Sequence, residues 1–201
     1  MSSKEIIKAI ESSDNGTFDA LVQKDKSASL DSASLKSLQV GAIRIHSVDC
    51  KNTEWEACLF DGTAFDGVDL QGAYFNGCTF HECEFRNAIL AEASFDGCVW
   101  QKSAIREAED LEAVEFSNCQ FKACDLEDLN LVDGVLESLT ITEGTIRNVD
   151  GIAELKSVVL RNVDIDNFDT SEMTLTACTS SGCTQVPRGF ATCEGRRVWW
   201  V

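Results

Sequence analysis

Large apolar residues recur at every fifth position through the middle of this chain. The unbroken series is Phe60, Phe65, Leu70, Phe75, Phe80, Phe85, Leu90, Phe95, Trp100 and Ile105. A small residue stands two positions before each of them, as Cys58 and Ala73 do, and most other positions are polar or glycine. A period of five matches neither a helix nor the alternation of a flat strand. A fixed period sustained over this length is typical of a repeat architecture.

If every fifth side chain points inward, the chain must turn by the same angle every five residues. Four such turns close a square coil of about 20 residues, and neighbouring coils pair roughly 4.8 Å apart. Glycines two places after a large residue predict the corners, because glycine tolerates a positive φ there; they are Gly62, Gly67, Gly72, Gly77 and Gly97. We therefore expect a solenoid whose core is a stack of side chains.

The register extends in both directions from this stretch. Upstream it includes Leu30, Leu35, Val40, Ile45, Cys50 and Trp55, and downstream Leu111, Phe116, Phe121, Leu126, Leu131, Leu136, Ile141, Ile146, Leu155, Leu160, Ile165, Thr170 and Leu175. One extra residue precedes Leu111, and a second slip lies within residues 147–154; we expect both to be small surface bulges. Residues 3–12 predict an amphipathic helix that caps the first coil. The predicted domains are an N-terminal helical cap (1–25), the repeat region (26–180) and a C-terminal capping or association tail (181–201).

This pattern resembles the pentapeptide-repeat family over residues 26–180. The resemblance implies an all-β fold, a right-handed quadrilateral β-helix of about seven coils. Some members of the family are acidic rods that occupy the DNA-binding groove of DNA gyrase and protect it from poisons. The chain is similar to that DNA-mimicking group in size, charge and repeat number.

The formal net charge is −17 and the sequence pI is near 4.4. Such a charge disfavours direct binding to nucleic acid or to an anionic membrane and favours a basic protein partner. The N-terminus lacks the apolar centre of a signal peptide, and no apolar run approaches the length of a membrane span. These features predict a cytoplasmic protein.

The register also assigns outward residues to the sides of the rod. The first two sides are predicted to form an acidic interaction face, with candidate residues Asp49, Asp69, Asp110, Glu54, Glu115, Glu56, Asp96 and Glu112. The third side is nearly uncharged and rich in β-branched residues. With the C-terminal tryptophans it forms a candidate association surface, represented by Leu59, Val99, Val159, Trp199 and Trp200. The acidic columns are also explained by solubility alone, since a flat-sided β rod needs charge to resist lateral aggregation.

Most of the ten cysteines occupy the small inward position, as Cys58, Cys78 and Cys98 do. A free cysteine there is a small buried hydrophobe, so we expect inert packing thiols in a reducing compartment. No CxxC pair with a nearby histidine suggests a metal site. His46 and His81 fall far apart at outward positions, and no serine, threonine or cysteine has a partner histidine in the pattern. The sequence therefore predicts no catalytic site, cofactor or metal.

Two functional hypotheses remain open. In the first, the protein is a non-enzymatic binding module whose acidic half engages a basic groove of DNA gyrase, a topoisomerase-like enzyme or another DNA-binding protein. In the second, it is a structural or assembly protein that uses the neutral third side and the Trp199–Trp200 end, either to dock a partner or to form a homodimer. Salt separates them, because an electrostatic complex weakens steeply as ionic strength rises.

Overall fold

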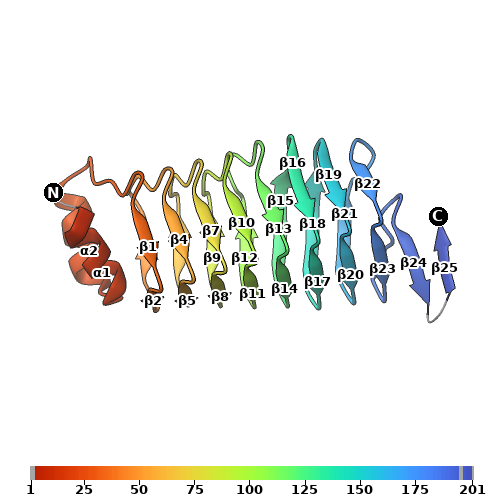
Figure 1. The fold of residues 1–201 in the computed structure, drawn as a ribbon, viewed down its shortest axis with the longest axis horizontal. Helices are drawn as coiled ribbons and strands as arrows, with labels where there is room; N and C mark the ends of the chain where they lie inside the picture. Colours follow the sequence, from red (N-terminus) through yellow and green to blue (C-terminus); the bar gives the residue numbers. More distant parts are fainter. Residues whose placement is uncertain (1–2, 195–196, 201) are drawn as a thin grey trace.

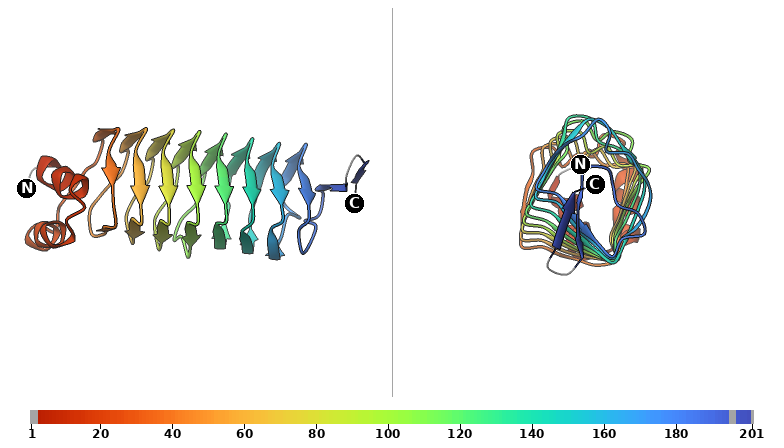
Figure 2. Two further views of the ribbon diagram at one scale, coloured as in Figure 1. Left: turned by 90° about the horizontal axis from the view of Figure 1, so that it is seen from below. Right: turned by 90° about the vertical axis from the view of Figure 1, so that its right-hand side faces the viewer.

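The computed structural model describes residues 3–194 and 197–200, with side chains for residues 3–191. The chain forms a parallel β-solenoid in which successive coils stack along one axis (Figures 1 and 2). Two helices, α1 (Ser3–Glu11) and α2 (Asn15–Lys24), lie at its N-terminal end. The predicted quadrilateral β-helix with a helical cap is confirmed.

Three sides of each coil pair with the next coil as continuous sheets. The second side is an eight-stranded sheet of β1 (Ser34–Lys36), β4 (Glu54–Glu56), β7 (Tyr74–Asn76), β10 (Ser94–Asp96), β13 (Glu115–Ser117), β16 (Gly134–Glu137), β19 (Ala153–Lys156) and β22 (Thr174–Thr176). The third side begins with β2 (Gln39–Val40), β5 (Leu59–Asp61), β8 (Thr79–His81), β11 (Val99–Gln101), β14 (Gln120–Lys122), β17 (Thr140–Thr142), β20 (Val159–Arg161) and β23 (Thr179–Ser181). The fourth side contains β3 (Arg44–Ile45), β6 (Ala64–Asp66), β9 (Glu84–Arg86), β12 (Ala104–Arg106), β15 (Asp125–Asn130), β18 (Thr145–Asp150) and β21 (Asp164–Phe168).

The first side is built differently. In the N-terminal half its coils form no continuous strands, and isolated bridges join Ser29, Asp49, Asp69, Ile89 and Asp110 in one column. Further on, β15, β18 and β21 continue around the corner from the fourth side, so that Leu129, Val149 and Phe168 also pair. The first side is thus the least regular face of the rod.

The C-terminal tail extends the third-side sheet. Strand β24 (Ala191–Glu194) pairs in parallel with β23, and β25 (Arg197–Trp200) returns antiparallel to β24. Figures 1 and 2 show this hairpin at the far end of the rod. Trp199 and Trp200 therefore lie on the last strand of that sheet, and their side chains fall outside the described residues.

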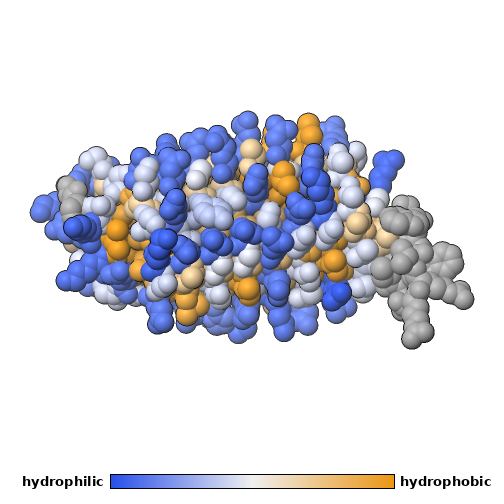
Figure 3. Space-filling view, viewed as in Figure 1, coloured by the Kyte–Doolittle hydropathy of each residue, from blue (hydrophilic) through white to orange (hydrophobic). Residues whose placement is uncertain are grey.

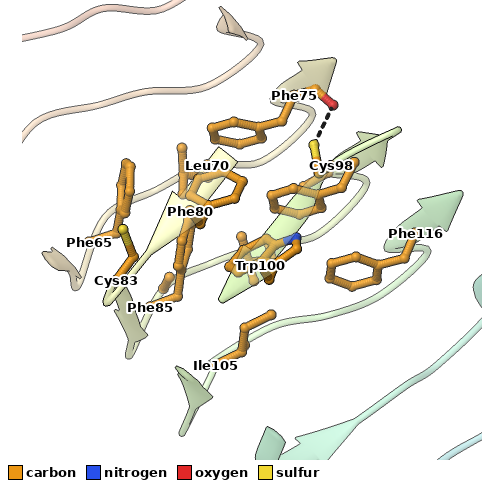
Figure 4. Packing of buried hydrophobic residues seen from close by; sticks show 14 of the residues in the cluster. Phe65, Leu70, Phe75, Phe80, Cys83, Phe85, Cys98, Trp100, Ile105 and Phe116 are labelled. Atoms are coloured by element: carbon orange, nitrogen blue, oxygen red, sulfur yellow. Dashed lines mark hydrogen bonds between the residues drawn. The ribbon is translucent and has the colours of Figure 1, made fainter. Parts of the chain in front are cut away.

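The core consists of the predicted inward columns. Trp55, Phe75, Phe95 and Phe116 stack along the second side, with successive ring centroids 5.8, 4.8 and 4.8 Å apart. Phe60, Phe80, Trp100 and Phe121 stack along the third side, and Figure 4 shows how these columns meet edge to face in the centre. Such arrangements add to the stabilisation from burial alone. Of the predicted inward positions, Leu126 and Leu175 are only partly buried.

Aliphatic residues replace the rings in the later coils. Leu136, Ile141 and Ile146 take the positions that Phe95, Trp100 and Ile105 hold earlier, and a cavity of about 40 Å³ with an entirely apolar lining remains among them. The smaller side chains leave this space because the backbone ladder keeps the coils at a fixed spacing.

Corners require a left-handed backbone whether or not glycine is present. The predicted corner glycines adopt it, with φ between 60° and 70°. Many other corners hold Ala, Ser, Asn, Glu or Lys at nearly the same φ, for example Ala57 at 53° and Lys102 at 49°. This conformation costs roughly 1 kcal/mol for each residue with a Cβ, so the ladder of hydrogen bonds between coils must impose it.

Candidate interaction surfaces

The predicted acidic residues lie on two different sides. Asp49, Asp69 and Asp110 share the bridge column of the first side, and Glu112 lies beside them on that side. Glu54 and Glu115 share one column of the second side, whereas Glu56 and Asp96 share another. Neutral and basic neighbours lower the density of negative charge on the second side. Tyr74 and Ser94 separate Glu54 from Glu115, and Lys36 pairs with Glu56.

The first side carries negative charge that few basic residues balance. Beyond the four candidates, its exposed acidic residues include several that the sequence analysis missed: Asp31, Glu92, Asp133, Asp150, Asp169 and Glu172. Continuing the register through the two slips would have identified the last four, whereas Asp31 and Glu92 precede both slips and follow from the unbroken register. Among the positions of this side that the structure describes, residues 29–32 through 169–172, Lys51 is the sole basic residue, and it pairs with Asp69 at 3.0 Å.

Several aspartates of this side also stabilise the turn in which they lie. Asp49 accepts a hydrogen bond from the backbone N–H of Lys51 at 3.0 Å, and Asp110 accepts one from Glu112 at 3.0 Å. Asp169 accepts one from Ser171 at 2.9 Å, which lowers the pKa of its carboxyl together with the nearby charge of Arg188. These bonds fix the carboxylates in position.

The third side is neutral, as predicted. Its outward column contains Gln39, Leu59, Thr79, Val99, Gln120, Thr140, Val159 and Thr179. Its charges balance, since Asp61, Glu82 and Glu143 are matched by Lys102, Lys122 and Arg161. Leu59 is exposed, whereas Val99 and Val159 are half-buried. This side therefore offers little apolar surface apart from Leu59.

The fourth side carries a ladder of arginine–carboxylate pairs that the sequence analysis missed. Arg106 pairs with Asp125 and Glu127, and Arg147 pairs with Glu127 at 3.1 Å and with Asp164 at 3.6 Å. The partners lie about one coil apart in sequence. An arginine and an acidic residue in neighbouring columns of successive coils would therefore have predicted these pairs. These mutual pairs leave the fourth side fewer free carboxylates than the first.

The two histidines contact nearby side chains separately. His46 contacts Asp19 at 2.8 Å and the hydroxyl of Ser47 at 3.1 Å, so the expectation that no serine has a partner histidine is wrong at this position. His81 contacts Asp61 at 2.7 Å. Burial raises the pKa of Cys83 to about 11, and it also raises that of Cys50. No group of three potential metal ligands occurs among the described side chains. None of the helices in the described part of the chain has the length and apolarity needed to cross a membrane.

Comparison with known proteins finds the repeat in a family model. Residues 64–99 match the family model "Pentapeptide repeats" in eight copies, and no curated protein matches. Among solved structures, the chain is similar to full-length QnrB1, a plasmid-mediated fluoroquinolone resistance protein, at 20% identity and a TM-score of 0.43, over 77% of this chain and 87% of that one. It is also similar to HetL, a pentapeptide repeat protein involved in heterocyst differentiation regulation in Nostoc sp. strain PCC 7120, at 16% identity and a TM-score of 0.24, over 81% and 84% of the two chains.

Proposed function

Because this chain is a pentapeptide-repeat protein, we propose that it is a non-enzymatic binding module whose acidic first side engages a basic surface on a DNA-binding protein, such as DNA gyrase. The observation that carries this proposal is the concentration of acidic residues on one face that contains a single lysine. Figure 3 shows hydrophilic side chains over much of one face of the rod. A cytoplasmic location follows from such a partner.

The charge density of the rod supports this choice of partner. A net charge of −17 on a rod roughly 35–40 Å long corresponds to about one negative charge per 2 Å, close to the ~1.7 Å per charge of duplex DNA. A surface that binds the phosphates of a duplex therefore meets a similar field here. Because the carboxylates are held by turn hydrogen bonds and a rigid backbone, little side-chain entropy is lost on binding.

Charge-neutralising variants test the proposal. Asp49→Asn, Asp69→Asn and Asp110→Asn together remove three charges from the first side, and asparagine keeps the turn hydrogen bonds. The matched control removes three charges from the third side with Asp61→Asn, Glu82→Gln and Glu143→Gln. We expect the first-side variant to weaken binding to purified DNA gyrase at least tenfold and to flatten the salt dependence, while the control has a much smaller effect. Equal losses in both variants would show that only total charge matters.

A second function is favoured by the C-terminal hairpin. Strand β25 continues the neutral third-side sheet, and its outer edge has no partner strand among the described residues. An open edge of this kind can pair with a second chain. The alternative is therefore a structural or assembly protein that self-associates or docks a partner through the third side and the strand that contains Trp199 and Trp200. Association of this type should persist in 0.5 M salt (a concentration at which the Debye length is roughly 4 Å), where the electrostatic complex dissociates.

A further inference from the structure

Both departures from the five-residue register affect the first side. The extra residue lies in the segment 107–110, so Ile105 pairs with Leu126 across a coil one residue longer than its predecessors. The second slip shortens the coil around Gly151, and Leu136 consequently pairs with Leu155. These irregular coils are neighbours, and the surface between them is hollowed.

Gly151 explains the depth of the larger hollow. It takes the place that Leu131 holds one coil earlier, at a φ of 118°, and a Cβ there would lie 2.6 Å from both the N and the O of Leu131. The coil is therefore drawn tightly onto its neighbour and contributes no side chain at this point. A hollow of about 350 Å³ results, bordered by Val132, Ile152, Asp150, Asp169 and Glu172. A second hollow of about 170 Å³ adjoins it, shares Asn130 and Val132, and is bordered by Asp110 and Glu112.

The two adjoining hollows form one trough, and two exposed apolar side chains, Val132 and Ile152, lie along it. Ile152 is 54% exposed and Val132 is 37% exposed, and Ile152 is the most exposed large apolar residue among the described side chains. They occupy equivalent positions on successive coils, since the N–H of Asp133 donates to the carbonyl of Ile152 at 2.7 Å. Figure 3 shows apolar surface interrupting the hydrophilic outline at the upper edge of the rod near β16.

The other hollow on this side differs in chemistry. It lies at the N-terminal end beside Asp49 and Asp69, has a volume of about 500 Å³, and includes Lys26 in its lining. Its apolar residues, Ala28 and Val48, are buried. Of these hollows on the first side, only the trough combines exposed apolar side chains with a rim of carboxylates. The charge of Arg188 acts on Asp169, where it contributes to the lowered pKa of that carboxyl.

We propose that the trough, defined by Val132, Ile152 and the surrounding carboxylates, anchors one apolar side chain of a partner protein that is flanked by lysine or arginine. This inference rests on the proposed function and names the contact that would give it specificity. The rim carboxylates before Val132 and those after Ile152 lie about three coils apart, or roughly 14 Å. An extended segment spans roughly 13 Å in four residues, so the fitting pattern is basic–x–apolar–x–basic, with the apolar side chain at the centre.

Two fluorescently labelled peptides test this assignment. One contains Lys-Ser-Leu-Ser-Lys between glycine flanks, and the other replaces the leucine with serine and has the same charge. Burying the leucine should make the first peptide bind about tenfold more tightly in fluorescence anisotropy. Ile152→Ser should abolish this preference while both peptides still bind, because the carboxylates remain. Leu59→Ser, which changes an apolar residue 41% exposed on the third side, is the matched control and should leave the preference intact.

The outcomes separate the inference from the function on which it rests. Salt-sensitive binding of both peptides with equal affinity would overturn the trough while supporting the acidic side as a binding surface. If neither peptide binds the wild-type protein at low salt, both ideas fail. A preference for leucine that Ile152→Ser leaves unchanged would place the apolar contact elsewhere and also overturn the trough. Circular dichroism of each variant verifies the fold, and Ile152→Thr, which retains a β-branched side chain, should give the same loss of preference as Ile152→Ser.

Discussion

Replacing Phe80 with alanine removes a ring from the middle of the aromatic stack. Phe80 is completely buried, and it stacks on Phe60 at 5.1 Å and on Trp100 at 4.0 Å. Its edge contacts include Phe75 at 5.7 Å and Phe85 at 5.5 Å. The substitution therefore deletes contacts to rings on three sides of the coil.

The expected loss lies near the upper end of the usual range. Large-to-small substitutions of buried phenylalanine cost about 3–5 kcal/mol, and the cost rises when the site cannot collapse. Here the coils are held apart by backbone hydrogen bonds, such as that from the N–H of Thr79 to the carbonyl of Cys58 at 2.9 Å. The lost ring–ring geometry adds about 0.5–1.5 kcal/mol for each strong pair. We expect Phe80→Ala to lower the free energy of unfolding by about 4–5 kcal/mol.

Guanidinium unfolding followed by far-UV circular dichroism measures this loss. Phe80→Leu should cost much less, because Leu160 occupies the same column in a later coil. Asp61→Ala should be close to neutral, since the Asp61 side chain is 63% exposed and its pair with His81 lies at the surface. Comparable losses for Phe80→Ala and Asp61→Ala would refute the inward register. Stacked repeats can unfold in segments, so the slope of the transition must be compared along with its midpoint.

Three further predictions concern the corners, the thiols and the tail. Gly151→Ala should destabilise the protein by about 2 kcal/mol or more in the same assay, because its Cβ would clash with the backbone of Leu131. Gly77→Ala should cost no more than about 1 kcal/mol, since nothing lies within 4 Å of that Cβ; equal effects would contradict the close packing at Gly151. Denatured, unreduced protein should titrate with close to ten free thiols, and the native protein should react slowly below pH 11 at Cys83 because its raised pKa keeps it protonated; bound zinc or blocked thiols would disprove inert packing. Deleting residues 196–201 should cause aggregation and earlier melting if the tail covers the rod in cis, or yield a monomer by light scattering if it forms a dimer; an unchanged mass and melting temperature would exclude both roles.

The sequence alone determined the architecture, because each inward position restricts the type of residue that can occupy it, whatever the rest of the chain contains. Each fifth residue had to be large and apolar, and each corner glycine had to tolerate a positive φ, so period and register could be read without knowing any contact. The neutral third side followed from the same register. Even the thiols could be assigned, since Cys58 and Cys78 occupy a position that elsewhere holds alanine or valine.

The tertiary structure decided features that depend on relations between coils. Ala57 and Lys102 adopt a left-handed backbone that neither residue prefers, because the coil-to-coil hydrogen bonds at these corners outweigh the local cost. The arginine–carboxylate ladder of the fourth side joins residues about one coil apart, so pairing depends on side-chain direction across the stack. The hollow that Gly151 opens beside Ile152 arises where the period fails. A repeat fixes what is repeated, whereas the shape of an irregular coil depends on how tightly it packs against its neighbours, which the sequence pattern does not encode.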